Sequence, residues 1–146
     1  MRKLLSIFVL GLILPVRAQK NKQVEAADQA FANMMYTTAL KNYRKAYSKI
    51  KDKDERNRIL YQTAECYRIM NNYRMAEPTY RRLLTQKYEE KQPLLLLHLA
   101  DILRFNRKYE QAIPFYQSFS ELQPDDPRGP LGLQSCQLNE TLSKTP

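Results

Sequence analysis

The chain has 146 residues, 43% of them apolar and 27% charged, so its composition lies in the globular range and its length favours one domain. Its formal net charge is +9, and a basic protein attracts acidic partners and anionic surfaces over long distances.

Residues 1–18 have the pattern of a removable export signal. Arg2 and Lys3 make a positive start, residues 4–14 form an apolar run with Ser6 as its single polar residue, and Ala18 closes a short segment that fits a cleavage site. The run is shorter than the roughly 20 apolar residues that cross a bilayer, which favours cleavage over an uncleaved anchor. We therefore expect an exported chain that begins at Gln19 and is periplasmic or envelope-associated.

Removal of this segment would leave a net charge of +6, because Arg2, Lys3 and Arg17 leave with it. A basic exported domain suits an acidic protein face, an anionic envelope polymer or an anionic membrane surface. Outside the cytoplasm we expect no nucleic-acid partner.

Four columns of like residues recur along the chain at one pair of spacings, 37 residues and then 36. The columns are Ala27, Ala64 and Ala100; Tyr36, Tyr73 and Tyr109; Ala39, Ala76 and Ala112; and Tyr43, Tyr80 and Tyr116. Self-similarity at a fixed spacing of this size is typical of a repeat protein.

Each repeated unit contains two helical stretches. In the second stretch of the first unit the apolar residues recur at spacings of three and four, which makes one stripe along a helix: Tyr36, Ala39, Leu40, Tyr43 and Ala46. Alanines are expected where two helices cross closely, and tyrosines where they fill the wider gaps as ordinary core. The unit is therefore a helical hairpin, and the predicted fold class is all-α.

This pattern resembles the tetratricopeptide-repeat (TPR) family, which has small residues at the eighth and twentieth positions of a unit and aromatic residues at the seventeenth and twenty-fourth. In the middle unit these positions hold Ala64, Ala76, Tyr73 and Tyr80. The resemblance implies a right-handed TPR solenoid of three helical hairpins. It covers a TPR domain of residues 19–142, with units near residues 20–53, 57–90 and 93–126.

The family period is about 34 residues, so each unit here carries two or three extra residues. We place them in the polar stretches at residues 51–57 and 86–92, as surface turns.

The last segment, at about residues 127–142, starts a fourth unit and stops, so we predict a capping helix followed by a tail at 143–146. A solenoid end needs such a helix with one polar face. Cys136 then holds the same unit position as Cys66, two units away, which is too far for a disulfide. We expect two buried thiols.

A narrower resemblance rests on the turns at Asn71-Asn72-Tyr73 and Lys108-Tyr109 and on the ending Pro124-Asp125-Asp126-Pro127. These resemble the N-terminal TPR arm of Bacteroidetes envelope proteins linked to type IX secretion and gliding. In those proteins the arm precedes a propeller and an OmpA-like domain, neither of which lies within these 146 residues.

In the TPR family the first helices of successive hairpins line a concave groove that holds a partner. The resemblance implies contacts from Arg58, Tyr61, Glu65, Arg68, Leu94, Leu97, Asp101, Arg104 and Phe105, and places Asn21, Val24, Asp28, Phe31 and Ala32 at the same positions of the first unit. Arginine and aromatic residues are favoured anchors in protein recognition.

Two acidic residues of this set stand three positions before an arginine. Glu65 with Arg68 and Asp101 with Arg104 can each close a local ion pair, or the arginines can reach a partner carboxylate, and the sequence leaves both readings open. Chaperone-binding members of the family have asparagine at the ninth position of the unit. Here that position is acidic, which argues against that class of ligand.

Basic residues also follow the expected outer faces of the second helices, at Lys41, Arg44, Lys45, Lys49, Arg74, Arg81 and Arg82. Such a run is usually a solvated face, and the alternative is contact with an anionic surface.

Catalytic chemistry has little support in the sequence. The chain has one histidine, His98, and it lacks a glycine-rich phosphate loop, a paired Cys-x-x-Cys and a metal-ligand cluster. His98 near Asp101 could form a base and its orienting acid, but no nucleophile can be identified. We therefore expect no enzyme, no cofactor and no metal.

Two functions are consistent with this sequence. The first is a non-catalytic scaffold or adaptor of the cell envelope that binds a segment of another envelope protein or a peptide in its groove. The second is a structural arm attached by basic charge to an anionic envelope polymer or membrane face.

Overall fold

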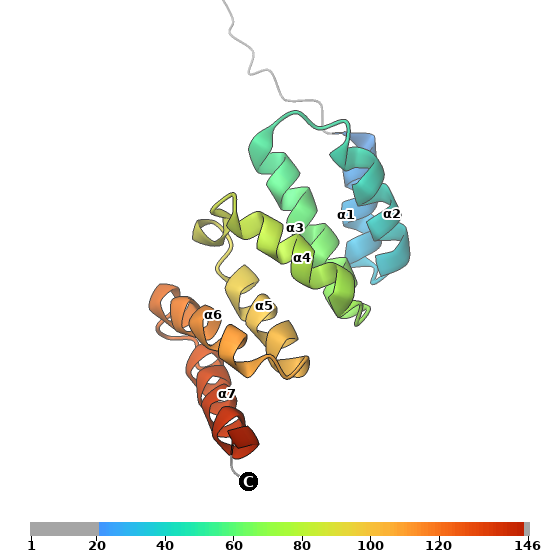
Figure 1. Ribbon diagram of the computed structural model, residues 1–146. Helices are drawn as coiled ribbons and strands as arrows, with labels where there is room; N and C mark the ends of the chain where they lie inside the picture. Colours follow the sequence, from blue (N-terminus) through green and yellow to red (C-terminus); the bar gives the residue numbers. More distant parts are fainter. Residues whose placement is uncertain (1–20, 145–146) are drawn as a thin grey trace, which may run out of the picture.

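The computed structural model describes residues 21–144, which form helical hairpins in chain order (Figure 1). The pairs are α1 (Lys22–Ala32) with α2 (Tyr36–Tyr47), α3 (Lys53–Ile69) with α4 (Tyr73–Leu84), and α5 (Leu94–Phe105) with α6 (Tyr109–Leu122), followed by α7 (Arg128–Lys144). A short 3-10 helix, η1 (Tyr88–Glu90), lies between α4 and α5. Within this range there is no strand, so the all-α prediction is confirmed. The predicted export signal at 1–18 lies outside the described residues.

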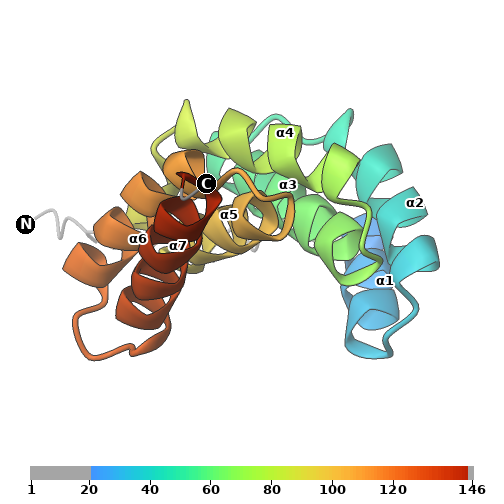
Figure 2. The same ribbon diagram turned by 60° about the horizontal axis from the view of Figure 1, so that its bottom comes forward.

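The hairpins stack side by side into an arch, as Figure 2 shows. Each hairpin contacts the next through α2 with α3 and α4 with α5. The helix α4 lies on the convex side of the arch, and α3 and α5 lie beneath it toward the concave side. This arrangement is the predicted solenoid of the TPR type.

The alanine columns occupy the helix crossings. Seven alanines are fully buried, at Ala27, Ala39, Ala46, Ala64, Ala76, Ala100 and Ala112. The large buried side chains beside them are Tyr43, Tyr80, Tyr116 and Phe119. An alanine lets two backbones approach closely. The distance between the helices of each hairpin is therefore determined by a small residue at the crossing and a large one next to it.

The core divides into two clusters that meet at α3. Ile59 and Cys66 pack with α1 and α2, whereas Leu60 and Ala64 pack with α4, α5 and α6. The helix is therefore apolar on more than one side, as expected for an interior element of a solenoid. The other interior helix, α5, buries a nearly continuous apolar run between Leu95 and Leu103.

The turn inside each hairpin has the same backbone form. Met34, Asn71 and Arg107, each the fifteenth residue of its unit, lie in the left-handed region with φ of 60°, 57° and 59°. The next residue donates its N–H to a carbonyl five positions back at 2.8 Å in all three cases, which closes the first helix. Glycine usually marks this cap, and none of the three positions holds one. The sequence analysis named the turns of the second and third hairpins, but it did not identify the backbone form that all three share.

The predicted capping helix is present as α7, and it lies against α6 with a smaller contact to α5. Its glycines make this approach possible, because a Cβ on Gly132 would overlap the ring of Tyr116 and one on Gly129 would overlap Ser120. The buried face of α7 holds Cys136. Two exposed positions of α7 that are apolar in every earlier unit hold glutamines, Gln134 and Gln137, and these line one hollow with the exposed Leu131 and Leu138.

Both cysteines are free thiols and both are buried, as predicted. They belong to different core clusters, Cys66 to that of α1 and α2 and Cys136 to the other. Burial raises the pKa of the Cys66 thiol to about 12 and also raises the pKa of Cys136. Both thiols therefore behave as apolar core atoms.

Among the described residues, no helix is long and apolar enough to span a membrane.

The crossing alanines give a first prediction. Ala64→Leu and Ala100→Leu should each lower the free energy of unfolding by about 1 to 3 kcal/mol, because an added side chain at a close crossing forces the helices apart. Chemical denaturation followed by circular dichroism measures this loss.

The matched control is Ala26→Leu, an exposed position of α1 where the same side chain meets solvent. Its unfolding midpoint should stay close to that of the unmodified protein. If all three variants unfold alike, the alanines do not set the crossings.

Candidate functional site

The acid at the ninth position of every unit accepts a hydrogen bond from the tyrosine fifteen residues later. The Oη of Tyr43 donates to Asp28 at 2.7 Å, that of Tyr116 donates to Asp101 at 2.5 Å, and that of Tyr80 donates to Glu65. Each bond joins the first helix of a hairpin to its second. The sequence analysis treated these tyrosines as plain core, and this interpretation missed the role of the hydroxyl groups.

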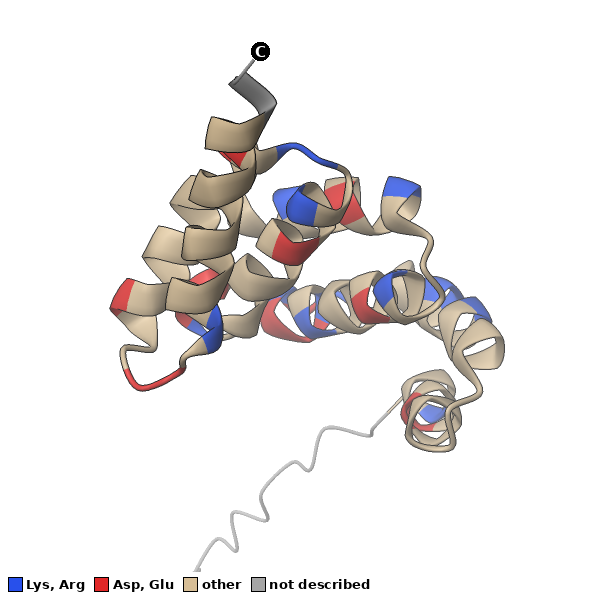
Figure 3. Cartoon of the chain, turned by 90° about the horizontal axis from the view of Figure 1, so that it is seen from below, with Lys and Arg blue, Asp and Glu red and all other residues tan. Residues whose placement is uncertain are grey.

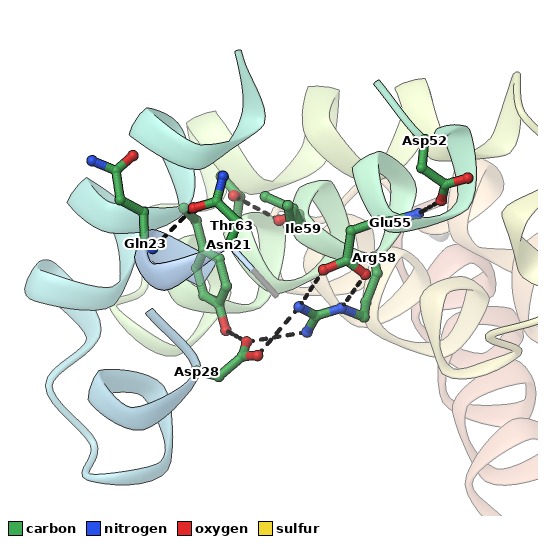
Figure 4. A network of polar contacts seen from close by, with 9 residues as sticks. Asn21, Gln23, Asp28, Asp52, Glu55, Arg58, Ile59 and Thr63 are labelled. Atoms are coloured by element: carbon green, nitrogen blue, oxygen red, sulfur yellow. Dashed lines mark hydrogen bonds and ion pairs between the residues drawn. The ribbon is translucent and has the colours of Figure 1, made fainter. Parts of the chain in front are cut away.

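In the first unit an arginine from the next unit completes the site. Arg58 of α3 donates to both oxygens of Asp28 at 3.1 and 3.2 Å and to Glu55 at 2.9 Å twice (Figure 4). This bidentate geometry suits the planar guanidinium, and the two carboxylates raise the pKa of Arg58 despite its partial burial. Arg58 therefore links α1 to α3. Its guanidinium, which was predicted to contact a partner in the groove, is already bound by two carboxylates of the protein itself.

In the second unit the acid is buried and receives three donors. Arg68 donates to Glu65 at 2.7 Å, the Nδ1–H of His98 donates at 2.7 Å, and Tyr80 is the third partner. His98 comes from α5, so this carboxylate joins α3, α4 and α5. The sequence analysis considered His98 as a partner of Asp101. In the structure His98 bonds to Glu65 instead.

These contacts decide the charge of Glu65. Burial by itself would raise the pKa of this carboxyl, but the hydrogen bonds from His98 and Arg68 outweigh it and lower the pKa to about 2. Burial and the neighbouring carboxylate together raise the pKa of Tyr80 well above its ordinary value. The site therefore holds an ionised carboxylate and a neutral phenol at neutral pH.

The third unit repeats the pattern closer to solvent. Arg104 lies 3.5 Å from Asp101 and donates to the Oη of Tyr116 at 2.9 Å, and both charged side chains are more than two-fifths exposed. Of the two alternatives that the sequence left open, the local ion pair is thus present at both acid–arginine spacings. They do not exclude a partner at Arg104, because an exposed pair contributes little and exchanges readily.

The nine predicted contact residues fall into three groups by burial. Tyr61, Glu65 and Leu97 are buried, with Leu97 only 2% exposed, so they support the face from below and offer no surface to a partner. Arg58, Arg68 and Leu94 are half-buried. Asp101 is partly exposed, and Arg104 and Phe105 are exposed. The prediction of a direct contact is therefore corrected for the buried three, whose side chains fill the space between α3, α5 and their hairpin partners.

Phe105 is the most exposed member of this set, at 69%. Its ring meets that of Tyr73 edge to face, with centroids 4.8 Å apart, so α4 holds it in place from the neighbouring unit. An aromatic ring that is both exposed and fixed suits a partner contact, because little further ordering is needed on binding.

Two further residues at groove positions were missed because they lie in the capping helix. Leu131 and Leu138 hold the positions that Leu97 and Arg104 hold in the third unit, and they are 61% and 59% exposed. A shallow hollow of about 600 Å³ lies beside them on α7. We call Arg104, Phe105, Leu131 and Leu138 the α5–α7 surface. The continuing repeat spacing could have identified the two leucines.

Charge is sparse at this end of the molecule. In Figure 3 the helix that runs to the C-terminus is almost entirely uncharged, whereas most other helices carry both signs. Within residues 21–144, no group of three or more histidine, cysteine or acidic side chains could hold a metal ion.

The fold and this face together define a helical-repeat solenoid with an exposed surface along its inner helices. The tetratricopeptide-repeat family model matches residues 95–130, which cover most of the third hairpin and the start of α7. This match supports the TPR family, whose repeats generally mediate protein–protein interaction as non-catalytic scaffolds. No curated protein matches the chain.

The Glu65 network gives a prediction about pH. The pKa of Glu65 in the folded protein is about 2, below its ordinary value of 4.5, so the stability it contributes is complete above about pH 4.5 and is lost as the pH falls through 2. Glu65→Gln should remove about 3 kcal/mol at pH 7, because the amide carries no charge to balance Arg68 and turns its NH₂ toward at least one of the donors that the carboxylate accepts from.

Denaturation of the parent protein and the variant across pH 2 to 7 checks this, and the two stability curves should converge at low pH. The control is Asp101→Asn, where solvent can replace the lost bonds and a smaller change is expected. Parallel curves for Glu65→Gln and the parent would contradict the role of Glu65.

Proposed function

We propose that this protein is a non-catalytic adaptor that binds a segment of another protein on its α5–α7 surface. The observation that carries the proposal is the exposure of Phe105, Leu131 and Leu138 together at groove positions of neighbouring units. Equivalent positions of stacked repeats lie about one helix spacing apart, roughly 10 Å, so one bound segment can contact several of them.

The composition of this surface favours a protein partner. Three apolar side chains and one arginine offer a contact with both an anchor and a directional donor, which is typical of the residues that dominate interface energies. Exposed apolar groups that gather on one face of a soluble chain commonly mark an interaction site. The partner segment that fits best presents apolar side chains and a carboxylate or carbonyl for Arg104.

The proposed place of action is the cell envelope, in secretion or envelope assembly. Support comes from the export pattern of residues 1–18 and from the resemblance to envelope proteins with a TPR arm, both read from sequence. The partner would then be another envelope protein or a peptide segment.

The second candidate is a structural arm held by basic charge on an anionic polymer or membrane face. Exposed Lys41, Arg44 and Lys45 on α2 favour it, because they have no ion-pair partner among the described residues. Ionic strength separates the two functions, since a contact with apolar anchors persists at high salt and a charge-driven one weakens as the Debye length falls below about 10 Å.

The adaptor function predicts a loss of partner affinity for the double variant Phe105→Ala with Leu138→Ala. A partner isolated from envelope extract with the parent protein is titrated against each purified variant by calorimetry. We expect the affinity to fall at least about tenfold, which corresponds to 1.4 kcal/mol.

The matched control is Met75→Ala with Leu122→Ala, which removes two exposed apolar side chains outside the α5–α7 surface. It should leave the affinity unchanged within about twofold. Equal losses in both double variants, or a complex that dissociates in high salt, would rule out the adaptor reading.

A further inference from the structure

A second hollow, of about 300 Å³, lies where the end of α2, the start of α3 and the end of α4 meet. Four basic side chains line it, Lys51, Lys53, Arg56 and Arg82, together with Tyr47 and Asn57. No acidic side chain contributes to its wall. The hollow therefore concentrates positive charge at one point of the surface.

The basic side chains of this hollow are free of carboxylates. Among the described residues, none of the four makes an ion pair, in contrast to Arg58 and Arg68 on the concave side. The acids nearest in sequence are used elsewhere. Asp52 caps α3 by accepting from the N–H of Glu55 at 2.8 Å, Asp54 pairs with Lys91 at 2.7 Å, and Glu55 pairs with Arg58.

Tyr47 holds the two arginines in position. The guanidinium of Arg56 lies 4.6 Å from the centre of its ring and that of Arg82 lies 5.4 Å from it, and Arg82 also donates to the Oη at 2.8 Å. Two like charges are thus kept together by one aromatic ring. Their remaining N–H donors are available to a ligand.

Asn57 adds a neutral polar group to the wall of the hollow. The residue is 8% exposed, and its carboxamide makes no hydrogen bond to any described residue. Its polar atoms are not among the buried atoms without a partner, so they reach the solvent that fills the hollow and are free to bond to a ligand there. Its NH₂ adds a neutral donor to the four basic groups around the same space.

We propose that this hollow binds a phosphate group. Its polar lining offers donors from lysine, arginine and asparagine, which matches a tetrahedral anion with acceptors only, and its four positive charges suit an anion of charge near −2. The volume exceeds that of the phosphate itself, so a phosphate-bearing molecule such as a lipid headgroup or a soluble phosphate ester fits the space.

This site is separate from the proposed adaptor surface. Arg56 and Arg58 stand two residues apart on α3, which turns their side chains by about 200° around the helix axis. Arg58 points to Asp28, and Arg56 points to Tyr47 on the other side. A phosphate ligand here leaves the α5–α7 surface open.

The test is a titration of the purified protein with pyrophosphate. Calorimetry measures the binding, and NMR spectra record the side-chain amide signals of Asn57 during the titration. We expect saturable binding and a shift of the Asn57 signals. The isosteric variant Asn57→Asp, which places a negative charge in the hollow, should weaken binding at least about tenfold. Circular dichroism confirms that it stays folded.

A second pair of variants separates the site from net charge alone. Arg56→Ala with Arg82→Ala should weaken pyrophosphate binding at least about tenfold, whereas Arg44→Ala with Arg74→Ala, which removes the same charge from exposed positions on α2 and α4, should change it by less than about twofold. Equal weakening in both pairs, or no saturable binding by the parent protein, would overturn the proposal.

Vesicles identify the source of the phosphate. If vesicles containing phosphatidic acid, whose headgroup is a phosphate monoester, bind the parent protein but not Asn57→Asp, the ligand is a lipid headgroup. If pyrophosphate binds and the vesicles do not, it is a soluble phosphate. Vesicle binding that Asn57→Asp leaves unchanged, without saturable pyrophosphate binding, counts against the site.

Discussion

The structure depends on satisfying an ionised carboxylate inside a helical stack. Glu65 lies where α3, α4 and α5 meet, and its charge would be costly there without donors from all three helices. Each donor comes from a fixed place, since Tyr80 belongs to the same hairpin and His98 to the next. Packing at the alanine crossings brings the helices close, and the carboxylate then selects one alignment of neighbouring units. Asp28 does the same between α1 and α3 through Arg58.

These networks also decide which part of the concave side remains open. Arg58 and Arg68, both of the second unit, are already paired with Asp28, Glu55 and Glu65, so they are less available to a partner. In the third unit the acid and arginine are more exposed than in the second. On α7, the positions that correspond to Leu97 and Arg104 hold the exposed Leu131 and Leu138. The charged networks between helices and the proposed recognition surface therefore lie toward different ends of the molecule.

The sequence predicted the fold more fully than the site. Repeat spacing and the alanine and tyrosine columns were enough for the hairpins, because close crossings admit few other residues. The role of the tyrosine hydroxyls was missed because a tyrosine at a core position was interpreted only as an apolar side chain that fills space. The acids that accept their hydrogen bonds lie fifteen residues away on another helix. The hollow at Tyr47 brings together three helices and two units, so no spacing along the chain could indicate it.

The division of the core at α3 has a consequence for cooperativity. The buried residues of the first hairpin share one cluster with Ile59 and Cys66 of α3, while the other core residues of α3 belong to the cluster of the rest of the stack, which the half-buried Leu40 and Tyr47 of α2 also touch. Sub-global opening can therefore release α1 and α2 as one foldon and leave the remaining helices folded. Polar contacts across that boundary include the two hydrogen bonds from Arg58 to Asp28 and the one from Arg82 to Tyr47. We therefore expect the amide protons of α1 and α2 to exchange faster than those of α5, whose leucines lie within the larger cluster.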